Sequence, residues 1–206
     1  MAITNGYCTL AELKTYLGLS GSGQDDNLEN AVDSASREID AICGRFFYQT
    51  SSEAKYFTPI NALYVDVPDI SSPSGLALLI DTTDDGSHDK TLTINTDFYT
   101  APLDAGNEVA GVQAQPITQI KILDTRSSER FNPTIVKQVK ITCQWGWSTV
   151  PHAIKQATLL QATRLFKRKD SPFSTYGNPE TGTGELFNKF DPDAMKLIKG
   201  YIKRTL

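Results

Sequence analysis

Two histidines, three cysteines and one acidic turn are the residues of this chain whose chemistry could support catalysis or metal binding. His88 lies in a glycine-containing turn at 86–89, and His152 follows a proline at the expected start of a helix. A catalytic role for either histidine would need partners that are distant in the sequence. No histidine and cysteine residues cluster at the spacing of zinc ligands. We therefore predict no catalytic, cofactor-binding or metal-binding residues.

The cysteines, the acidic turn and a tryptophan pair also favour structural roles. Cys8, Cys43 and Cys143 are scattered and form no CxxC pair, which predicts reduced thiols, at least two of them buried, in a reducing compartment. The acidic turn at 81–86 could hold a cation, but it lacks the distal glutamate of an EF-hand loop. We expect it to be a solvated hairpin tip. The Trp-Gly-Trp sequence at 145–147 is expected to pack at a corner rather than to form a ligand platform.

Charge is distributed unevenly along the chain, whose formal net charge is −4. Residues 1–149 contain 10 Lys/Arg and 19 Asp/Glu, whereas residues 150–206 contain 10 and 5, so the two parts carry −9 and +5. This asymmetry is either a chance bias of solvated faces or a sign that acidic and basic surfaces meet between subunits or partners. A basic end could also contact nucleic acid, for example through Lys167, Arg168 and Lys169.

The length and composition are those of a globular protein. A chain of 206 residues suits one domain, or one domain with an appendage. Its hydrophobic content of 39% and charged content of 21% are ordinary for a protein with a buried core. The longest apolar run is too short to cross a bilayer, so we expect no membrane-spanning helix. The first residues lack the pattern of a secretory signal, so we expect no signal peptide.

Four helices are predicted from capping residues and apolar periodicity. Thr9 and Glu12 have the spacing of a capping box. Asp25 or Asp26 is expected to cap the next helix, in which apolar residues recur at intervals of three and four along 28–43. The expected helices span 9–17, 26–43, 151–169 and 191 to the last residue.

Between 46 and 147 the helical period gives way to alternation and turn clusters, which predicts strands. The expected strands lie at 55–58, 63–67, 77–81, 92–94, 117–123 and 135–145. Together these elements predict an α+β fold: a small helical bundle that carries an antiparallel β insert at about 46–147. This part, residues 1–169, is expected to form one domain.

The last 37 residues, 170–206, are expected to form an extended C-terminal arm that ends in a helix. The polar and glycine-rich stretch of about 20 residues after the third helix has no apolar period and is long for an internal connection. The final helix has an apolar stripe that includes Leu197, Ile198 and Tyr201. Helix-in-groove docking on a partner is therefore expected, and docking back on the same domain is the alternative.

Several parts of the sequence, in this order, resemble the head–tail connector, or adaptor, proteins of long-tailed bacteriophages. The first is YCTLAELKTYLGL at 7–19, followed by DDNLENAVDSASREIDAICGRFF at 25–47. The second is VKITCQWGWSTVPHAIKQATLLQATRLFKRKDSPF at 139–173, and the third is DPDAMKLIKGYIKR at 191–204. The resemblance covers most of the chain, but nothing is carried over for the longer insert at 71–115.

The resemblance implies a structural virion protein without enzymatic activity or cofactors. It implies a ring of about twelve copies beneath the portal protein, with a stopper or tail-completion protein on the other face. DNA would pass through the channel without sequence-specific binding, and no membrane would be involved. The chain would be in the virion neck, and in the host cytoplasm during assembly. By position, portal contacts would fall on Phe173, Leu186, Phe187, Phe190, Leu197, Ile198, Tyr201 and Ile202.

Two alternatives remain open on the sequence. One is an enzyme with an unrecognised site, which converging acidic side chains in a deep pocket would favour. The other is a nucleic-acid-binding module that uses the basic C-terminal region, which steeply salt-dependent DNA binding would favour.

Overall fold

The structure, a computed structural model, describes residues 3–105, 115–168, 175–176, 184–185 and 190–203. The chain divides into two compact units. Residues 1–45 and 150–206 form the first, here called the helical unit, and residues 46–149 form the second, the sheet unit. The two ends of the chain therefore share one unit, and the middle of the chain forms the other.

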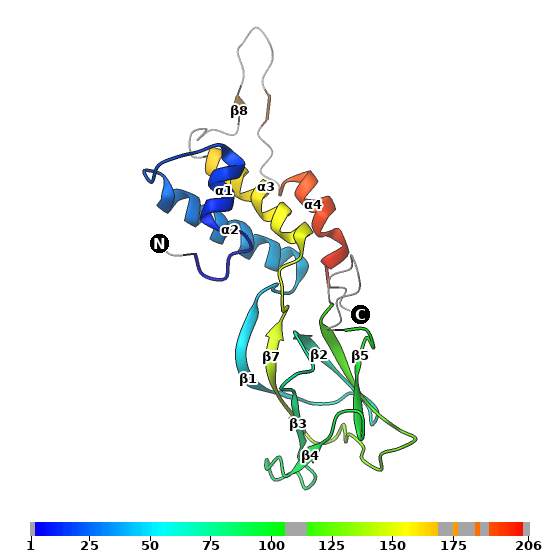
Figure 1. Ribbon diagram of the computed structural model, residues 1–206. Coiled ribbons are helices and arrows are strands. Elements are labelled where there is room, and N and C mark those ends of the chain that lie inside the picture. The colour runs from blue at the N-terminus through cyan, green and yellow to red at the C-terminus, as the bar shows by residue number, and fades with distance from the viewer. Residues whose placement is uncertain (1–2, 106–114, 169–174, 177–183, 186–189, 204–206) are drawn as a thin grey trace. The chain divides into compact units, whose positions relative to one another are not determined.

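Among its described residues the helical unit has four α-helices, shown in Figure 1: α1 (Leu10–Leu17), α2 (Asp25–Cys43), α3 (His152–Arg168) and α4 (Pro192–Ile198). A short 3-10 turn, Lys199–Tyr201, follows α4. Helices α1, α2 and α3 pack on one another, and α4 packs on α3. All four helices lie close to the predicted positions, although the last one ends before the chain does.

The helix ends follow the expected chemistry with one difference. The Thr9 hydroxyl accepts a hydrogen bond from the Glu12 amide at 3.2 Å, and the Glu12 carboxylate accepts one from the Thr9 amide at 2.9 Å. This confirms the predicted capping box. Helix α2 begins earlier than expected, because Gln24 occupies its N-cap without a side-chain bond. Asp25 and Asp26 lie in its first turn, where their charge favours the positive end of the helix dipole.

The apolar stripe of α2 forms the centre of the helical unit. Its residues Leu28, Val32 and Ala35 are buried against Leu13 of α1 and Ala162 of α3. Because residues three and four apart share one side of a helix, this is the side that the periodicity predicts.

In the described part of the sheet unit, 46–105 and 115–149, there are seven antiparallel strands: β1 (Gln49–Phe57), β2 (Tyr64–Ile70), β3 (Ala77–Ile80), β4 (Lys90–Leu92), β5 (Phe98–Ala101), β6 (Ile117–Ile122) and β7 (Val139–Gly146). They are ordered β4-β3-β7-β2-β6-β5, and β1 pairs with β7. Strand β7 is the branch point, because it pairs with β1, with β3 and, at Trp145, with Ile70 of β2. The sheet curls around one core, to which β2 to β7 contribute buried residues and β1 contributes the half-buried Phe57.

The Trp-Gly-Trp corner at the end of β7, residues 145–147, is buried as predicted. Trp145 donates from its indole nitrogen to the Glu53 carbonyl oxygen at 3.0 Å. Trp147 donates to a buried carboxylate oxygen of Asp69 at 2.9 Å. Both indole N–H groups therefore have acceptors inside the sheet unit, as buried tryptophans require.

The prediction of a small helical bundle carrying a β insert and ending in an extended arm is wrong. The segment 46–149 is a compact, nearly closed sheet with its own core and about half of the chain. The terminal helix α4 is not the end of an arm, because it packs on α3 of the same chain. Turn clusters indicated where the strands of an antiparallel sheet are divided, but they could not indicate that β1 and β7, which are some 90 residues apart, are neighbours.

Candidate interaction surfaces

The histidines do not belong to a reactive cluster in the part of the chain that the structure describes. His88 is half-buried beside the Tyr56 ring, 5.2 Å between centroids, and its Nε2 atom lies 3.0 Å from the Lys137 carbonyl oxygen. His152 is exposed at the start of α3. No three histidine, cysteine, aspartate or glutamate residues gather to hold a metal ion among the described residues. No described helix is long and apolar enough to cross a membrane.

The three cysteines are free and buried, which confirms the prediction of reduced, buried thiols. Burial raises the pKa of Cys8 and of Cys143 to about 12 and that of Cys43 to about 11. All three thiols are therefore protonated near neutral pH, whereas nucleophilic attack and metal binding need the thiolate.

The acidic turn between β3 and β4 uses its first carboxylate to hold its own backbone. Residues 82–86 are exposed, as expected for a solvated hairpin tip, but Asp81 is buried. Its carboxylate accepts hydrogen bonds from the amides of Thr83, Asp84 and Gly86 at 2.8–3.0 Å. Burial alone would raise the pKa of Asp81, but these backbone donors outweigh it and lower the pKa. This carboxylate is therefore a structural group of the turn.

Replacement of Asp81 by alanine is expected to lower the melting temperature of the sheet unit at neutral pH. The lowered pKa means that the ionised Asp81 stabilises the fold above the ordinary aspartate pKa of about 4. That stabilisation is lost as the pH falls through the folded-state pKa, so the difference between wild type and Asp81→Ala should shrink in acid. Thermal melts at several pH values test this, with the exposed Asp104→Ala as control. A difference that grows in acid would contradict it.

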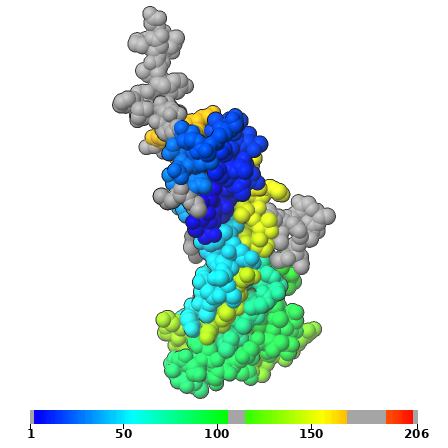
Figure 2. All heavy atoms as spheres, turned by 60° about the vertical axis from the view of Figure 1, so that its left-hand side comes forward, coloured from blue at the N-terminus to red at the C-terminus, as the bar shows by residue number. Residues whose placement is uncertain are grey.

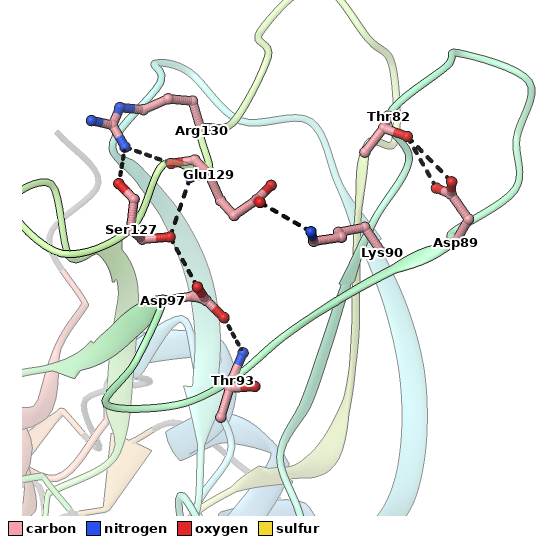
Figure 3. Close-up of polar contacts among 8 residues, drawn as sticks. All are labelled: Thr82, Asp89, Lys90, Thr93, Asp97, Ser127, Glu129 and Arg130. Carbon is pink, nitrogen blue, oxygen red and sulfur yellow. Dashed lines mark hydrogen bonds and ion pairs between the residues drawn. The ribbon is translucent and has the colours of Figure 1, made fainter.

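A second set of polar side chains in the sheet unit, drawn in Figure 3, also holds loops together. Asp97 accepts hydrogen bonds from the Thr93 amide and the Ser127 hydroxyl, both at 2.9 Å. Lys90 of β4 forms an ion pair with Glu129 at 3.1 Å. These side chains point toward one another, so the arrangement stabilises the loops.

The C-terminal helix α4 is held on its own chain. Ala194 and Ile198 are fully buried, each with 0% of its surface exposed. The Asp191 carboxylate caps the helix by accepting from the amides of Asp193 and Ala194. The Lys203 amide donates to the Cys43 carbonyl oxygen at 2.8 Å, beyond the helix end. The apolar side of the last helix is therefore buried at Ala194 and Ile198, where the helix packs on α3, while Leu197 and Tyr201 are half-buried.

A polar chain of contacts fixes where α4 begins. The Gln161 side chain on α3 donates to the Glu38 carboxylate at 2.7 Å and accepts from the Asp191 amide at 3.1 Å. Arg164 forms an ion pair with Asp191 at 3.7 Å. The presence of a glutamine at a buried position of α3 was the sequence signal for this junction, and sequence reasoning did not use it.

The segment between α3 and Asp191, the N-cap of α4, is 22 residues long, 169–190; we call it the excursion. Its far end adjoins Asp191, which contacts Arg164, only one turn before α3 ends at Arg168. One helical turn is about 5.4 Å, whereas 22 extended residues could cover roughly 70 Å. Within the excursion, β8 (Thr175–Tyr176) pairs antiparallel with β9 (Gly184–Glu185). The segment is therefore much longer than the connection requires.

The residues predicted to contact a portal differ in how far they are exposed. Ile198 is buried within the chain, and Phe190, Leu197 and Tyr201 are half-buried. Ile202 is 37% exposed. The remaining three, Phe173, Leu186 and Phe187, lie outside the described residues.

Comparison with known proteins finds similarity in structure alone. No known family model matches the sequence, and no curated protein matches it. A chain in the neck of the empty gene transfer agent particle, solved with C6 symmetry, matches with a TM-score of 0.55 and 15% identity over 100% of this chain and 95% of its own length. A chain in the neck of the native particle, solved with C12 symmetry, matches with a TM-score of 0.53 and 15% identity. This match covers 100% of the present chain and 94% of the neck chain. A chain in the native gene transfer agent virion matches with a TM-score of 0.52 and 16% identity, over 100% of the present chain and 95% of that chain.

At these identities the likeness establishes the fold. The expected resemblance to connector proteins is confirmed at that level, because the chain has, over its whole length, the fold of chains in the neck of a gene transfer agent particle.

Proposed function

We propose that this chain is a structural virion protein: a head–tail connector adaptor that forms a ring beneath the portal and joins the DNA-filled head to a stopper or tail. The observation that carries the proposal is the shared fold over the full chain with neck chains of the gene transfer agent particle, solved with C6 and C12 symmetry. A ring of about twelve copies accords with those symmetries. In this role the protein is not an enzyme, and DNA passes through the channel without sequence-specific binding.

The excursion, residues 169–190, is the proposed portal-binding segment. Its aromatic and aliphatic residues Phe173, Leu186, Phe187 and Phe190 would supply the apolar contacts. Two features support this choice over α4. The excursion is longer than its connection requires, and the apolar stripe of α4 is already buried at Ile198. Partly exposed residues beyond α4, such as Ile202, could add to the contact without undocking the helix.

Replacement of residues 169–189 by six Gly and Ser residues is expected to abolish attachment to purified portal rings. Six flexible residues span roughly 13 Å, which is enough to join Arg168 to the start of α4. Since α4 keeps its docking site, the variant should remain folded with an unchanged melting temperature. Sedimentation of the variant with portal rings measures attachment, with the unmodified chain as control.

This design separates binding from folding, which deletion of all residues from 170 onward would not, because that deletion also uncovers the α4 site on α3. Normal attachment of the linker variant would show that residues 169–189 of the excursion do not bind the portal.

The wider role is tested in particles made without this chain. If the chain is the adaptor, filled heads should accumulate without tails, and supplying the chain in trans should restore tailed particles. Electron microscopy measures the fraction of heads with tails. Tails present at the normal fraction in its absence would contradict the proposed function.

A further inference from the structure

Strand β1 has a free edge. It pairs antiparallel with β7 on one side, and no described strand lies beside its other side. Figure 1 shows β1 at the margin of the sheet, and in Figure 2, where that side comes forward, its cyan lies at the surface. An edge strand directs backbone N–H and C=O groups away from its own sheet, so it can pair with the strand of another chain.

β1 is also the one described strand of the sheet unit without a buried residue. Six of its nine residues are exposed and three are half-buried. Lys55 lies over the Trp145 ring, with Nζ 4.6 Å from the ring centroid, and the Phe57 ring lies 5.8 Å from it. Because side chains alternate along a strand, Glu53 shares this face with Lys55, whereas Ala54 lies on the opposite face.

Two opposite charges lie in the middle of this strand. Glu53 and Lys55 form an ion pair with each other at 3.2 Å, and both side chains are partly exposed. Charges on an edge strand ordinarily oppose pairing with unrelated strands. A strand that carries the same two charges in the reverse order is an exception, because each charge then meets its opposite. A second, antiparallel copy of β1 presents them in that order.

Charge also selects the register of such a pair. In a twofold antiparallel pair one residue faces its own copy, and residues equally far on either side of it face each other. Centring on Glu53 would place two carboxylates opposite each other, and centring on Lys55 would place two ammonium groups opposite each other. Centring on Ala54 places Glu53 of each copy opposite Lys55 of the other. Like charges directly opposite destabilise a strand pair and opposite charges stabilise it, so the register centred on Ala54 is favoured.

We propose that two copies of the free chain pair antiparallel through β1, centred on Ala54, so that one sheet continues across both copies. In this register Ser52 of each copy lies opposite Tyr56 of the other, and the small Ala54 lies at the axis. Backbone hydrogen bonds supply the attraction, and the charges specify the partner. A twofold contact ends at two copies, whereas a ring needs a head-to-tail contact. The inference therefore goes beyond the proposed function and concerns the chain before it enters a ring.

The first test determines the register by disulfide formation in the full-length chain. Ala54→Cys places two thiols opposite each other, with Cβ atoms about 4.5–5.5 Å apart, which is close to the separation in a disulfide. A mild oxidant should therefore give covalent dimers that a reductant separates. The matched control is Ser52→Cys, on the same face of the same strand, whose two thiols would lie roughly 13 Å apart along the strands. The unmodified chain is the second control, because its native cysteines are buried. Neither control should form dimers on a non-reducing gel.

The second test reverses the two charges separately and together. Glu53→Lys and Lys55→Glu should each lower the association constant about tenfold or more, because both cross-strand pairs become like-charged. An equal mixture of these two variants should associate again, since every charge then meets its opposite. The chain with both substitutions should pair like the unmodified chain. Asp104→Lys and Lys137→Glu make the same charge changes at exposed positions of the sheet unit and should have no effect. Sedimentation velocity measures the association constants.

Four results would overturn the inference: an unmodified chain that stays monomeric, equal cross-linking at 52 and 54, no cross-linking at 54, or a mixture of folded variants that does not recover. Circular dichroism and thermal melts identify any loss of folding. Lys55→Glu removes the contact with Trp145, but Ala54→Cys leaves both charges in place and tests the register without that change. If the chain associates and the single charge variants associate equally well, another surface is responsible and the inference is wrong.

The inference and the proposed function fail separately. A monomeric free chain whose absence still leaves heads without tails would contradict the inference and support the proposed function. Pairing through β1 by a chain that particles do not need for tails would support the inference and contradict the proposed function.

Discussion

Replacement of Gly146 by alanine is expected to destabilise the sheet unit by about 3–5 kcal/mol, in the range reserved for severe backbone and packing conflicts. Gly146 has φ of +94°, where a side chain is strained. A Cβ atom at this position would lie 1.9 Å from the Tyr48 carbonyl oxygen and 2.6 Å from the Phe46 ring. The carbonyl oxygen belongs to the backbone and accepts a hydrogen bond from the Trp147 amide, so it cannot move without breaking the corner.

Urea denaturation followed by tryptophan fluorescence measures this loss, because both tryptophans flank residue 146. The matched control is Gly75→Ala in the same unit, where φ is +74° but nothing lies within 4 Å of the added atom. The control removes the same conformational freedom without the collision, so about 1 kcal/mol is expected. Equal losses at the two positions would show that the close approach at Gly146 does not matter.

Replacement of Ile198 by alanine is expected to cost about 2–4 kcal/mol in the stability of the helical unit, the range for truncation of a fully buried aliphatic side chain. Ile198 is 0% exposed and secures α4 on α3. Its loss should loosen α4, so hydrogen exchange of the Met195 and Lys203 amides should become faster. Chemical denaturation and exchange mass spectrometry measure both effects.

The control for this change is Ile202→Ala, four residues further along the chain and 37% exposed. Its effect should stay within about 0.5 kcal/mol, as for most surface substitutions. If Ile198→Ala were as mild as Ile202→Ala in the free chain but abolished portal attachment, Ile198 would serve a partner and its burial on α3 would be unimportant.

The helices could be predicted because their signals are local. Thr9, Glu12 and Gly18 all belong to α1 or to its two caps. The apolar stripe from Leu28 to Cys43 indicates both a helix and the side of it that is buried. The burial of the tryptophans at 145 and 147 also followed from their place between a strand and a helix. Such patterns need only the spacing of residues along one element.

The sheet could not be predicted to the same extent, because its organisation depends on contacts between distant segments. Strand β5 was missed, since its four residues 98–101 follow no long alternating run. The pairing of Glu53 with Cys143 joins positions 90 residues apart, and no local pattern indicates such a register. The compact sheet unit therefore emerged only from the structure.

The candidate surfaces illustrate the same limit. The polarity and length of 170–189 led us to expect that everything after this segment projects away from the domain, whereas α4 packs on α3. The side-chain contacts of Gln161 and Arg164 with Asp191 return the chain to α3, and they are formed between residues about 30 positions apart. A stripe of apolar residues shows that a helix needs a buried side, but it does not show which molecule provides it.

The division of the helical unit between the two ends of the chain has a consequence for synthesis on the ribosome. Helix α2 is complete at Cys43, but its partner α3 is complete only at Arg168, 125 residues later. At a translation rate of about 5–20 residues per second, this delay is roughly 6–25 s. Strand β7 ends at Gly146, so the sheet unit can close during that interval, before α3 has emerged. The nascent chain therefore completes its middle first, and Leu28, Val32 and Ala35 of α2 can pack with Ala162 of α3 only after that helix has been made.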